Sequence, residues 1–200
     1  MTEISPTTLP RADVVTHYVV SGRNHAPALV LLHPLAASLA IWDLQLAEFE
    51  RFFRVIRIDL RGHDQSNFDD GSARSHALQD LALDALAVLD ALRIERAHWC
   101  GLAIGGSTAL QVAITAPRRV LRLVLVNTAY DADLSARLGE VRAPTLVIAG
   151  AHDPATPAEQ AEALADGISG ADLVVLDAAH LPNVEQAEDL TRTVVNFLRD

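Results

Sequence analysis

Lysine is absent from this 200-residue sequence, and cysteine and methionine occur once each. The 16 basic residues are therefore all arginines, and 26 acidic residues outnumber them to give a formal net charge of −10. Because nucleic-acid binding needs clustered positive charge, we expect no nucleic-acid partner. The lone Cys100 excludes an internal disulfide and fits a reducing compartment.

Long apolar runs and a leader-like N-terminus are missing too. No run approaches the roughly 18 apolar residues needed to cross a bilayer, and residues 1–6 lack the basic start and apolar segment of a signal peptide. We therefore expect a cytoplasmic protein with no membrane span. The sequence also lacks metal-ligand spacing and a dinucleotide-binding glycine pattern, so we expect neither a metal nor a cofactor.

What the sequence does contain is an alternation of apolar runs and helical patterns. Strands are expected at 14–20, 28–32, 53–58, 120–127, 145–149 and 173–176, and one more begins at Ala97; helices are expected at 41–50, 76–92, 106–116, 157–168 and 184–199. This alternation predicts an α/β fold with a mostly parallel, doubly wound sheet and helices on both faces. Residues 1–200 are expected to form a single domain.

The stretch from Ala97 to Gly106 has the pattern of a strand, a sharp turn and a helix. Gly101, Gly105 and Gly106 would let the helix pack close behind the strand. The spacing matches the nucleophile elbow Gly-x-Ser-x-Gly, in which the serine sits at the tip of a strained turn. Ala103 stands where that serine would be. Taken alone, the stretch is also compatible with an ordinary strand-to-helix turn.

Two polar residues follow later apolar runs. Asp153 comes just after the run 145–149, and His180 comes soon after the run 173–176. Elbow, acid and histidine in this order is the chain order of the α/β-hydrolase triad. Read one at a time, Asp153 fits a turn carboxylate and His180 a loop histidine bonded to backbone, but their joint placement favours a triad.

The sequence resembles the α/β-hydrolases, and more narrowly the 3-oxoadipate enol-lactonases. The motifs that carry the resemblance are His33-Pro34-Leu35, Trp42-Asp43-Leu44-Gln45, Asp59-Leu60-Arg61-Gly62-His63, the elbow, Asn127-Thr128-Ala129, Asp153 with Pro157, and Ala179-His180-Leu181-Pro182-Asn183-Val184-Glu185-Gln186. They span nearly the whole chain. The resemblance implies an α/β-hydrolase core and a small-molecule ester or lactone as the substrate.

The resemblance also implies a set of site residues. Ala103, Asp153 and His180 occupy the triad positions, and the backbone N–H groups of Leu35 and Ile104 correspond to the oxyanion-hole donors. In that family the serine attacks the carbonyl carbon, the histidine takes its proton, and the acid holds the histidine in the right tautomer.

Other reactive residues near the elbow are expected to be structural. We expect His33 to brace its loop through hydrogen bonds and Cys100 to be a small buried apolar residue. Ser107 lies one helical turn, about 5 Å, below Ala103 and should be buried behind the tip. In the helix 76–92, the leucines form the buried face and Asp84 is expected to face solvent.

Besides Pro34, which stands where these hydrolases commonly have glycine, the chain departs from the family pattern in three places. Ala103 removes the nucleophile, and Asp64 stands where the family would have glycine. Near Tyr130 and Asp131, where these hydrolases insert a helical cap, the chain continues with residues that resemble the segment after the cap. We therefore expect no cap domain, a shallow open site, and an exposed apolar surface that favours a homodimer or the binding of lipid or detergent.

Two functions stay open at this point. The first is a carboxylic ester or lactone hydrolase without nucleophile and cap, produced by engineering, and inactive or weakly active. Loss of a triad nucleophile costs on the order of 10⁶ in turnover. The alternative is a non-catalytic ligand-binding protein with an α/β-hydrolase-like fold. The first is favoured because only the nucleophile is lost, while the acid, the histidine and the elbow glycines remain.

Overall fold

The computed structural model describes residues 5–11, 14–68 and 77–200. The strands are β1 (Ser5–Arg11), β2 (Val14–Gly22), β3 (Ala28–Leu32), β4 (Arg54–Ile58), β5 (Asn67–Phe68), β6 (Ala97–Leu102), β7 (Val120–Val126), β8 (Thr145–Gly150) and β9 (Asp172–Leu176). The α-helices are α1 (Asp43–Phe52), α2 (Leu78–Ala91), α3 (Ile104–Thr115), α4 (Ala132–Ser135), α5 (Ala158–Gly167), α6 (Pro182–Glu185) and α7 (Ala187–Arg199). Short 3-10 turns are η1 (Leu39–Trp42), η2 (Pro117–Arg119) and η3 (Leu138–Glu140).

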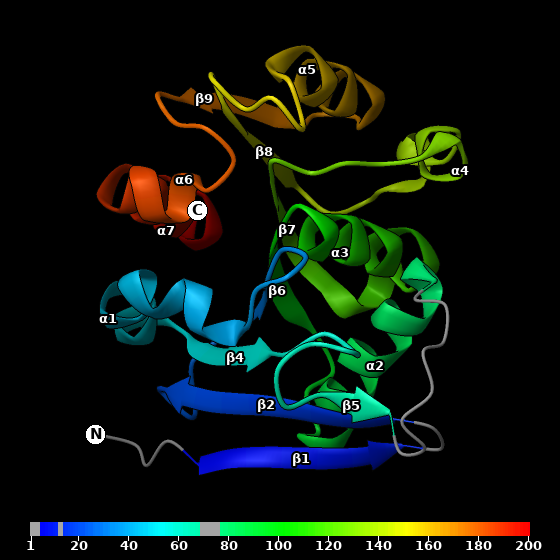
Figure 1. The fold of residues 1–200 in the computed structure, drawn as a ribbon, viewed down its shortest axis with the longest axis vertical. Helices are drawn as coiled ribbons and strands as arrows, with labels where there is room; N and C mark the ends of the chain where they lie inside the picture. The colour runs from blue at the N-terminus through cyan, green and yellow to red at the C-terminus, as the bar shows by residue number, and fades with distance from the viewer. Residues whose placement is uncertain (1–4, 12–13, 69–76) are drawn as a thin grey trace.

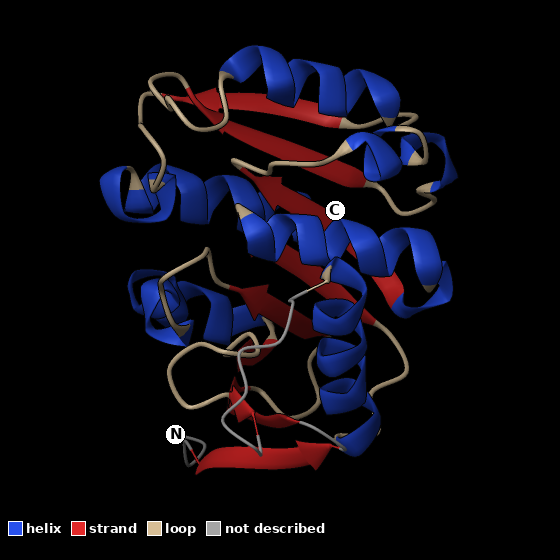
Figure 2. Cartoon of the chain, turned by 45° about the vertical axis from the view of Figure 1, so that its right-hand side comes forward, coloured by secondary structure: helices blue, strands red, loops and turns tan. Residues whose placement is uncertain are grey.

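Within the described residues, all strands belong to one nine-stranded sheet. Their order is β1-β2-β4-β3-β6-β7-β8-β9, and β5 pairs with β2. The pairs from β4 to β9 are parallel, whereas β2 pairs antiparallel with β1, β4 and β5. The predicted mostly parallel sheet is thus confirmed, and its helical connections are seen in Figure 2.

The two faces of the sheet carry separate apolar clusters. Successive residues of β3 alternate between them: Leu29 and Leu31 belong to one cluster, and Val30 and Leu32 to the other. The first cluster is completed by α1 and α7, and the second by α2, α3 and α5. Figure 1 shows α1 and α7 on one side of the sheet and α2 and α3 on the other. A strand buried on both faces explains why the predicted range 28–32 is apolar throughout and matches β3.

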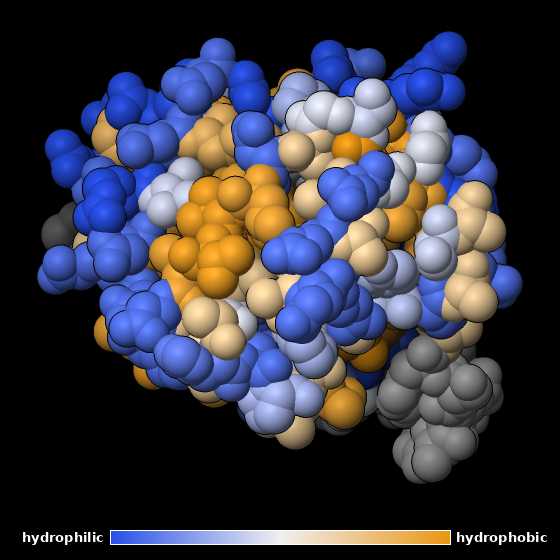
Figure 3. All heavy atoms as spheres, turned by 90° about the horizontal axis from the view of Figure 1, so that it is seen from above, coloured by the Kyte–Doolittle hydropathy of each residue, from blue (hydrophilic) through white to orange (hydrophobic). Residues whose placement is uncertain are grey.

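The two outer strands of the sheet differ in composition. β1, which was not predicted from the sequence, contains two prolines, as suits an edge strand whose outer N–H groups need no partner. β9 forms the other edge and has no proline, and Val175 within it is 48% exposed. Figure 3 views the molecule from the end at which β9 and α5 lie, where apolar residues gather among polar ones.

Two predictions about helices need correction. The helix expected at 184–199 is divided into α6 and α7, because Gln186 has φ −130° and ψ 50° and is not helical. Asp84 does not face solvent: it is 3% exposed and accepts two hydrogen bonds from the Arg61 guanidinium, at 2.6 Å and 2.8 Å. The sequence pattern missed this because Arg61 reaches α2 from the loop after β4.

The connection between β7 and β8 is short. Residues 127–144 contain only α4 and η3, so no cap domain separates the two strands. The chain is therefore an α/β core in which the carboxyl ends of the parallel strands lie uncovered by an inserted domain. Among the described residues, no helix is long and apolar enough to cross a membrane.

Candidate active site

Ala103 occupies a strained turn between β6 and α3. Its φ of 51° and ψ of −116° lie in a region that residues with a Cβ rarely adopt, at a cost of about 1–3 kcal/mol. The Ala103 N–H donates to the Val126 carbonyl at 2.9 Å, and the Ala103 carbonyl accepts from the Ser107 N–H at 3.0 Å. The backbone therefore has the sharp strand-to-helix geometry of a nucleophile elbow.

The glycines around the turn are required because other atoms approach their Cα atoms too closely to leave room for a Cβ. A Cβ on Gly101 would lie 2.2 Å from the Gly105 carbonyl oxygen, and one on Gly106 would lie 2.0 Å from Thr128 Oγ1. A Cβ on Gly105 would lie 2.3 Å from the Leu32 carbonyl oxygen and 2.7 Å from that of His33. The first turn of α3 thus packs directly against the end of β3 and the loop that leads to Leu35.

Asp153 and His180 are hydrogen-bonded to each other. His180 Nδ1 lies 2.7 Å from Asp153 Oδ2. The same carboxylate accepts from the Thr156 hydroxyl and, through Oδ1, from the Ala155 N–H at 2.8 Å. The Asp153 side chain is fully buried, while that of His180 is 35% exposed. With Nδ1 donating to the carboxylate, Nε2 of the imidazole is the nitrogen left for proton exchange.

The charge state of Asp153 follows from its contacts. Burial by itself would raise its pKa, but hydrogen bonds from Thr156, His180 and Ala155 outweigh burial and hold the pKa of Asp153 below its usual value. The carboxylate is therefore ionised at neutral pH, as an acid that orients a histidine must be.

The turn and the histidine loop meet at the carboxyl end of β7. Val126 binds the Ala103 N–H, and the next residue, Asn127, donates from its amide to the carbonyls of Ala179 and His180 at 2.9 Å and 3.1 Å. The Asn127 amide oxygen also accepts from the Gly150 N–H at 2.7 Å, at the end of the strand that leads to Asp153. The role of Asn127 is not apparent from the motif Asn127-Thr128-Ala129, because its partners lie far along the chain.

The predicted oxyanion-hole donors come from two neighbouring segments. Ile104 is the first residue of α3, where backbone N–H groups have no acceptor within the helix. Leu35 follows the end of β3, and its side chain is 66% exposed. The contact between Gly105 and the His33 carbonyl brings the two segments together. Their role as donors stays a prediction.

Residues 27–139 match the sequence model of the alpha/beta hydrolase fold family. The chain belongs to the α/β-hydrolase fold family. Residues 119–200 also match a model described as TAP-like protein.

This α/β-hydrolase has curated and structural relatives of similar type. It is 27% identical to 3-oxoadipate enol-lactonase 1 of Acinetobacter baylyi, over 90% of this chain and 91% of the relative. The crystal structure of the enol-lactonase from Burkholderia xenovorans superposes with a TM-score of 0.87 at 29% identity, covering 94% of this chain and 97% of that one. Carboxylesterase CesB from Bacillus subtilis, at 23% identity and a TM-score of 0.88, shares the fold.

The reactive residues beside the elbow make structural contacts in this chain, as predicted. His33 is buried; its Nδ1 donates to the Pro34 carbonyl at 2.7 Å and its Nε2 accepts from the Leu60 N–H at 2.9 Å. Burial lowers the pKa of His33, which fits this neutral tautomer. Ser107 is 3% exposed and donates to the Ala129 carbonyl at 2.5 Å. Cys100 is fully buried, which raises the pKa of its thiol.

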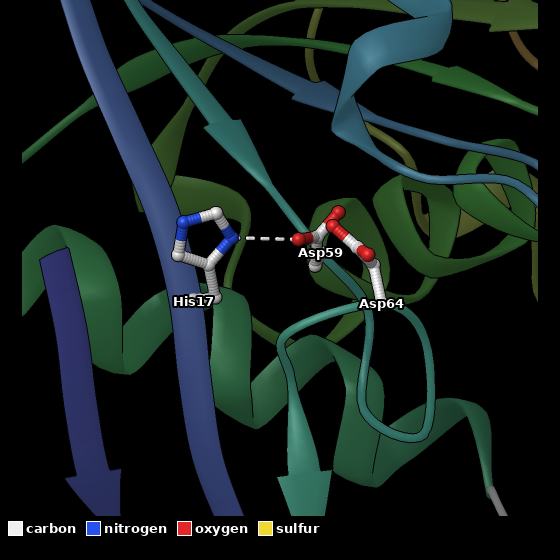
Figure 4. Close-up of side chains that lie close together, drawn as sticks. All are labelled: His17, Asp59 and Asp64. Atoms are coloured by element: carbon white, nitrogen blue, oxygen red, sulfur yellow. Dashed lines mark hydrogen bonds and ion pairs between the residues drawn. The ribbon is translucent and has the colours of Figure 1, made fainter. Parts of the chain in front are cut away.

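One group in the described part of the chain has metal-ligand spacing. Ligand atoms of His17, Asp59 and Asp64 lie within 4.8 Å of one another (Figure 4). However, Asp59 already binds His17 Nδ1 at 2.6 Å and the Leu39 N–H at 2.7 Å, and His17 turns Nε2 away from both carboxylates. Hydrogen bonds thus account for both Asp59 oxygens and for His17 Nδ1, whereas the buried His17 Nε2 has no hydrogen-bond partner among the described residues. The expectation that no metal is bound stays a prediction.

Proposed function

We propose that this chain is a carboxylic ester or lactone hydrolase of the 3-oxoadipate enol-lactonase type that lacks its nucleophile. The observation that carries the proposal is the arrangement around Ala103. The strained turn is kept, and Asp153 holds His180 through a 2.7 Å hydrogen bond, as a serine hydrolase requires. The names of the relatives, an enol-lactonase and a carboxylesterase, support the ester and lactone class.

With a serine at position 103, the reaction would be acyl transfer followed by hydrolysis. The serine oxygen would attack the carbonyl carbon while its proton passes to His180 Nε2, and the N–H groups of Leu35 and Ile104 would stabilise the oxyanion. His180 would then protonate the leaving oxygen and activate a water to release the acid. Ala103 closes this covalent route, which leaves only a slow direct attack by a water that His180 activates.

We further propose that the alanine and the missing cap were both introduced by engineering into a single core domain spanning residues 1–200. The alanine and the missing cap each change one place in the chain. The packing around the turn and the hydrogen bond between Asp153 and His180 are kept. In support, the match to the Acinetobacter relative extends over 247 positions, more than this chain has residues, so part of the relative has no counterpart here.

The proposed partners are a small-molecule substrate and a second copy of this chain. A small ester or lactone is the substrate, the chemistry needs no cofactor, and a cytoplasmic location without a nucleic-acid partner fits the acidic composition. Leu35 and Val184, near the ends of the strands, are 66% and 45% exposed. Exposed apolar side chains of this kind support a homodimer through the surface that a cap would cover.

A second function is favoured by Ala103 itself. Without a nucleophile the chain would be a non-catalytic ligand-binding α/β-hydrolase-like protein. The two functions differ in what a restored serine does, because a binding protein has no selection for an aligned histidine.

The deciding experiment is Ala103→Ser with hydrolysis of a short p-nitrophenyl ester. We expect turnover to rise by roughly three or more orders of magnitude over the Ala103 chain. The matched control adds His180→Ala to the serine variant, which should return turnover to the level of the Ala103 chain. If Ala103→Ser stays at background while the protein is folded, the hydrolase proposal is wrong and ligand binding becomes the function to test.

A further inference from the structure

The loop that carries His180 is held by side chains on both sides. Glu185, the last residue of α6, turns its carboxylate back to this loop: Oε2 accepts from the Ala179 N–H at 2.7 Å, and Oε1 accepts from the Leu181 N–H at 2.9 Å. The two amides flank His180. One carboxylate therefore binds the backbone immediately before and immediately after the histidine.

Asn127 binds two residues of the same loop, Ala179 and His180, through their backbone carbonyls. Its amide donates to the carbonyls of Ala179 and His180, and it is 1% exposed. Glu185 takes N–H groups and Asn127 takes carbonyls, so the two side chains do not compete for partners. The backbone of residues 179–181 is thereby fixed by four side-chain hydrogen bonds.

Further bonds fix the ends of this loop. The Gln186 amide donates to the Asp177 carbonyl at 2.9 Å, which closes the loop between its first and last residues. Asn183, inside α6, donates from its side-chain amide to the Ile41 carbonyl at 2.7 Å. The backbone carbonyl of Asn183 accepts from the Gln45 side-chain amide at 2.7 Å. The helix α6, which carries Glu185, is thus hydrogen-bonded to η1 and α1.

We propose that Glu185, opposed by Asn127, is a positioning residue for His180. The imidazole is 35% exposed, and among the described residues its ring is hydrogen-bonded only to Asp153, so the direction of Nε2 depends on the backbone that carries the ring. With the backbone clasped at residues 179 and 181, Nε2 keeps one direction while Nδ1 stays on the carboxylate. Small displacements of a catalytic group cost large factors in rate. The part that concerns catalysis rests on the hydrolase function proposed above.

A purely local role for Glu185 would be that of a helix cap, since Leu181 precedes α6 and a glutamate near a helix start often binds that N–H. A cap stabilises α6 but leaves the imidazole unaffected. The bond to the Ala179 N–H lies on the far side of His180 and is not explained by capping. The two roles therefore predict different behaviour of the His180 ring.

The first test uses the chain with Ala103 and needs no activity. In Glu185→Ala we expect the Ala179 and Leu181 amides to exchange about tenfold faster, and the NMR signal of the His180 Nδ1 proton, held on Asp153, to broaden or vanish. Glu185→Gln, whose amide oxygen can accept only one of the two N–H groups, should lie between. Glu188→Ala, an exposed glutamate in the first turn of α7, is the control and should change neither signal.

The second test is kinetic, in the Ala103→Ser background. Adding Glu185→Ala should lower kcat about tenfold while KM changes by less than about twofold, because the substrate contacts are kept and the base is displaced. Adding Glu188→Ala should leave both constants unchanged. Thermal unfolding of each variant checks that the exposed Glu185 is not needed for folding.

The outcomes separate the two proposals. An unchanged His180 proton signal in Glu185→Ala overturns the positioning role, whether or not the amides exchange faster, and reduces Glu185 to a helix cap. A lost proton signal together with an inactive Ala103→Ser chain supports the clasp and refutes the hydrolase function. A lost signal with an undiminished kcat shows that the clasp has no part in catalysis.

Discussion

At the scale of single residues, Ala103 keeps the strained backbone conformation of a nucleophile elbow although its side chain has no hydroxyl group. Ala103 holds φ at 51° because its N–H binds Val126 and its carbonyl binds Ser107, and both are backbone bonds that any residue except proline could make. The conformation thus belongs to the backbone path, not to the side chain at the tip. This is why a single substitution to serine is a fair test of the site.

Because the pKa of Asp153 is lowered in the folded state, its contribution to the free energy of unfolding should fall as the pH is lowered. A carboxyl whose pKa is depressed in the folded state contributes stability above its unfolded pKa of about 3.9, and loses it as pH falls through the folded value. We therefore expect Asp153→Asn to flatten the fall of the free energy of unfolding between about pH 5 and pH 3. Urea unfolding at several pH values in this window measures it.

The matched control for this titration is Asp166→Asn on the exposed surface of α5, which makes the same charge change away from the site. It should keep the slope of the unmodified chain. A steep loss of stability that persists in Asp153→Asn would show that other groups cause the acid sensitivity.

At the scale of elements, the packing of α3 against β3 decides whether the elbow forms. A Cβ on Gly105 would meet backbone carbonyls of residues 32 and 33, which cannot move aside as a side chain could. In an open helix, alanine would be favoured over glycine by about 1 kcal/mol. Here we expect Gly105→Ala to lower the free energy of unfolding by about 3 kcal/mol or more.

Gly139 offers a matched comparison within the same chain, because a Cβ there would meet nothing within 4 Å. Gly139→Ala should change the free energy of unfolding by no more than about 0.5 kcal/mol. Chemical unfolding of the two variants side by side measures the contrast. Equal effects from both substitutions would mean that close approach is not what Gly105 provides.

At the scale of the whole molecule, the two apolar clusters share one sheet. Each of the central strands contributes alternate residues to both, as Leu31 and Leu32 do in β3. Neither layer of helices can therefore unfold alone without exposing strands that also pack against the other layer of helices. We expect the chain to unfold in one cooperative transition, with a ratio of van't Hoff to calorimetric enthalpy of about 1.

Core variants on opposite faces test this coupling. Leu164→Ala, on the buried face of α5, and Leu190→Ala, on the buried face of α7, should each destabilise the same transition by about 2–5 kcal/mol. Differential scanning calorimetry shows whether one peak shifts or two peaks separate. Two peaks would mean that the core is not a single folding unit.

The sequence by itself determined the features that depend on neighbours along the chain. Apolar runs bounded by turns located β3 and β8 to within a residue, and the spacing of glycines located the elbow, because periodicity and turn chemistry act over a few residues. The order of Ala103, Asp153 and His180 was also readable, since strands of a parallel sheet deliver their following loops to one edge.

Only the tertiary structure decided which distant groups meet. Asp84 is buried because Arg61 crosses to it, and Asn127 and Glu185 clasp the His180 loop from β7 and α6; no periodic pattern encodes these pairs. A polar side chain far along the chain gains its partner only after the sheet has assembled, and burial then makes that partner obligatory. The sequence order pairs Asp153 with His180, and the structure shows their hydrogen bond; the side chains that hold the His180 loop could not be predicted, and the catalytic role of His180 stays a prediction.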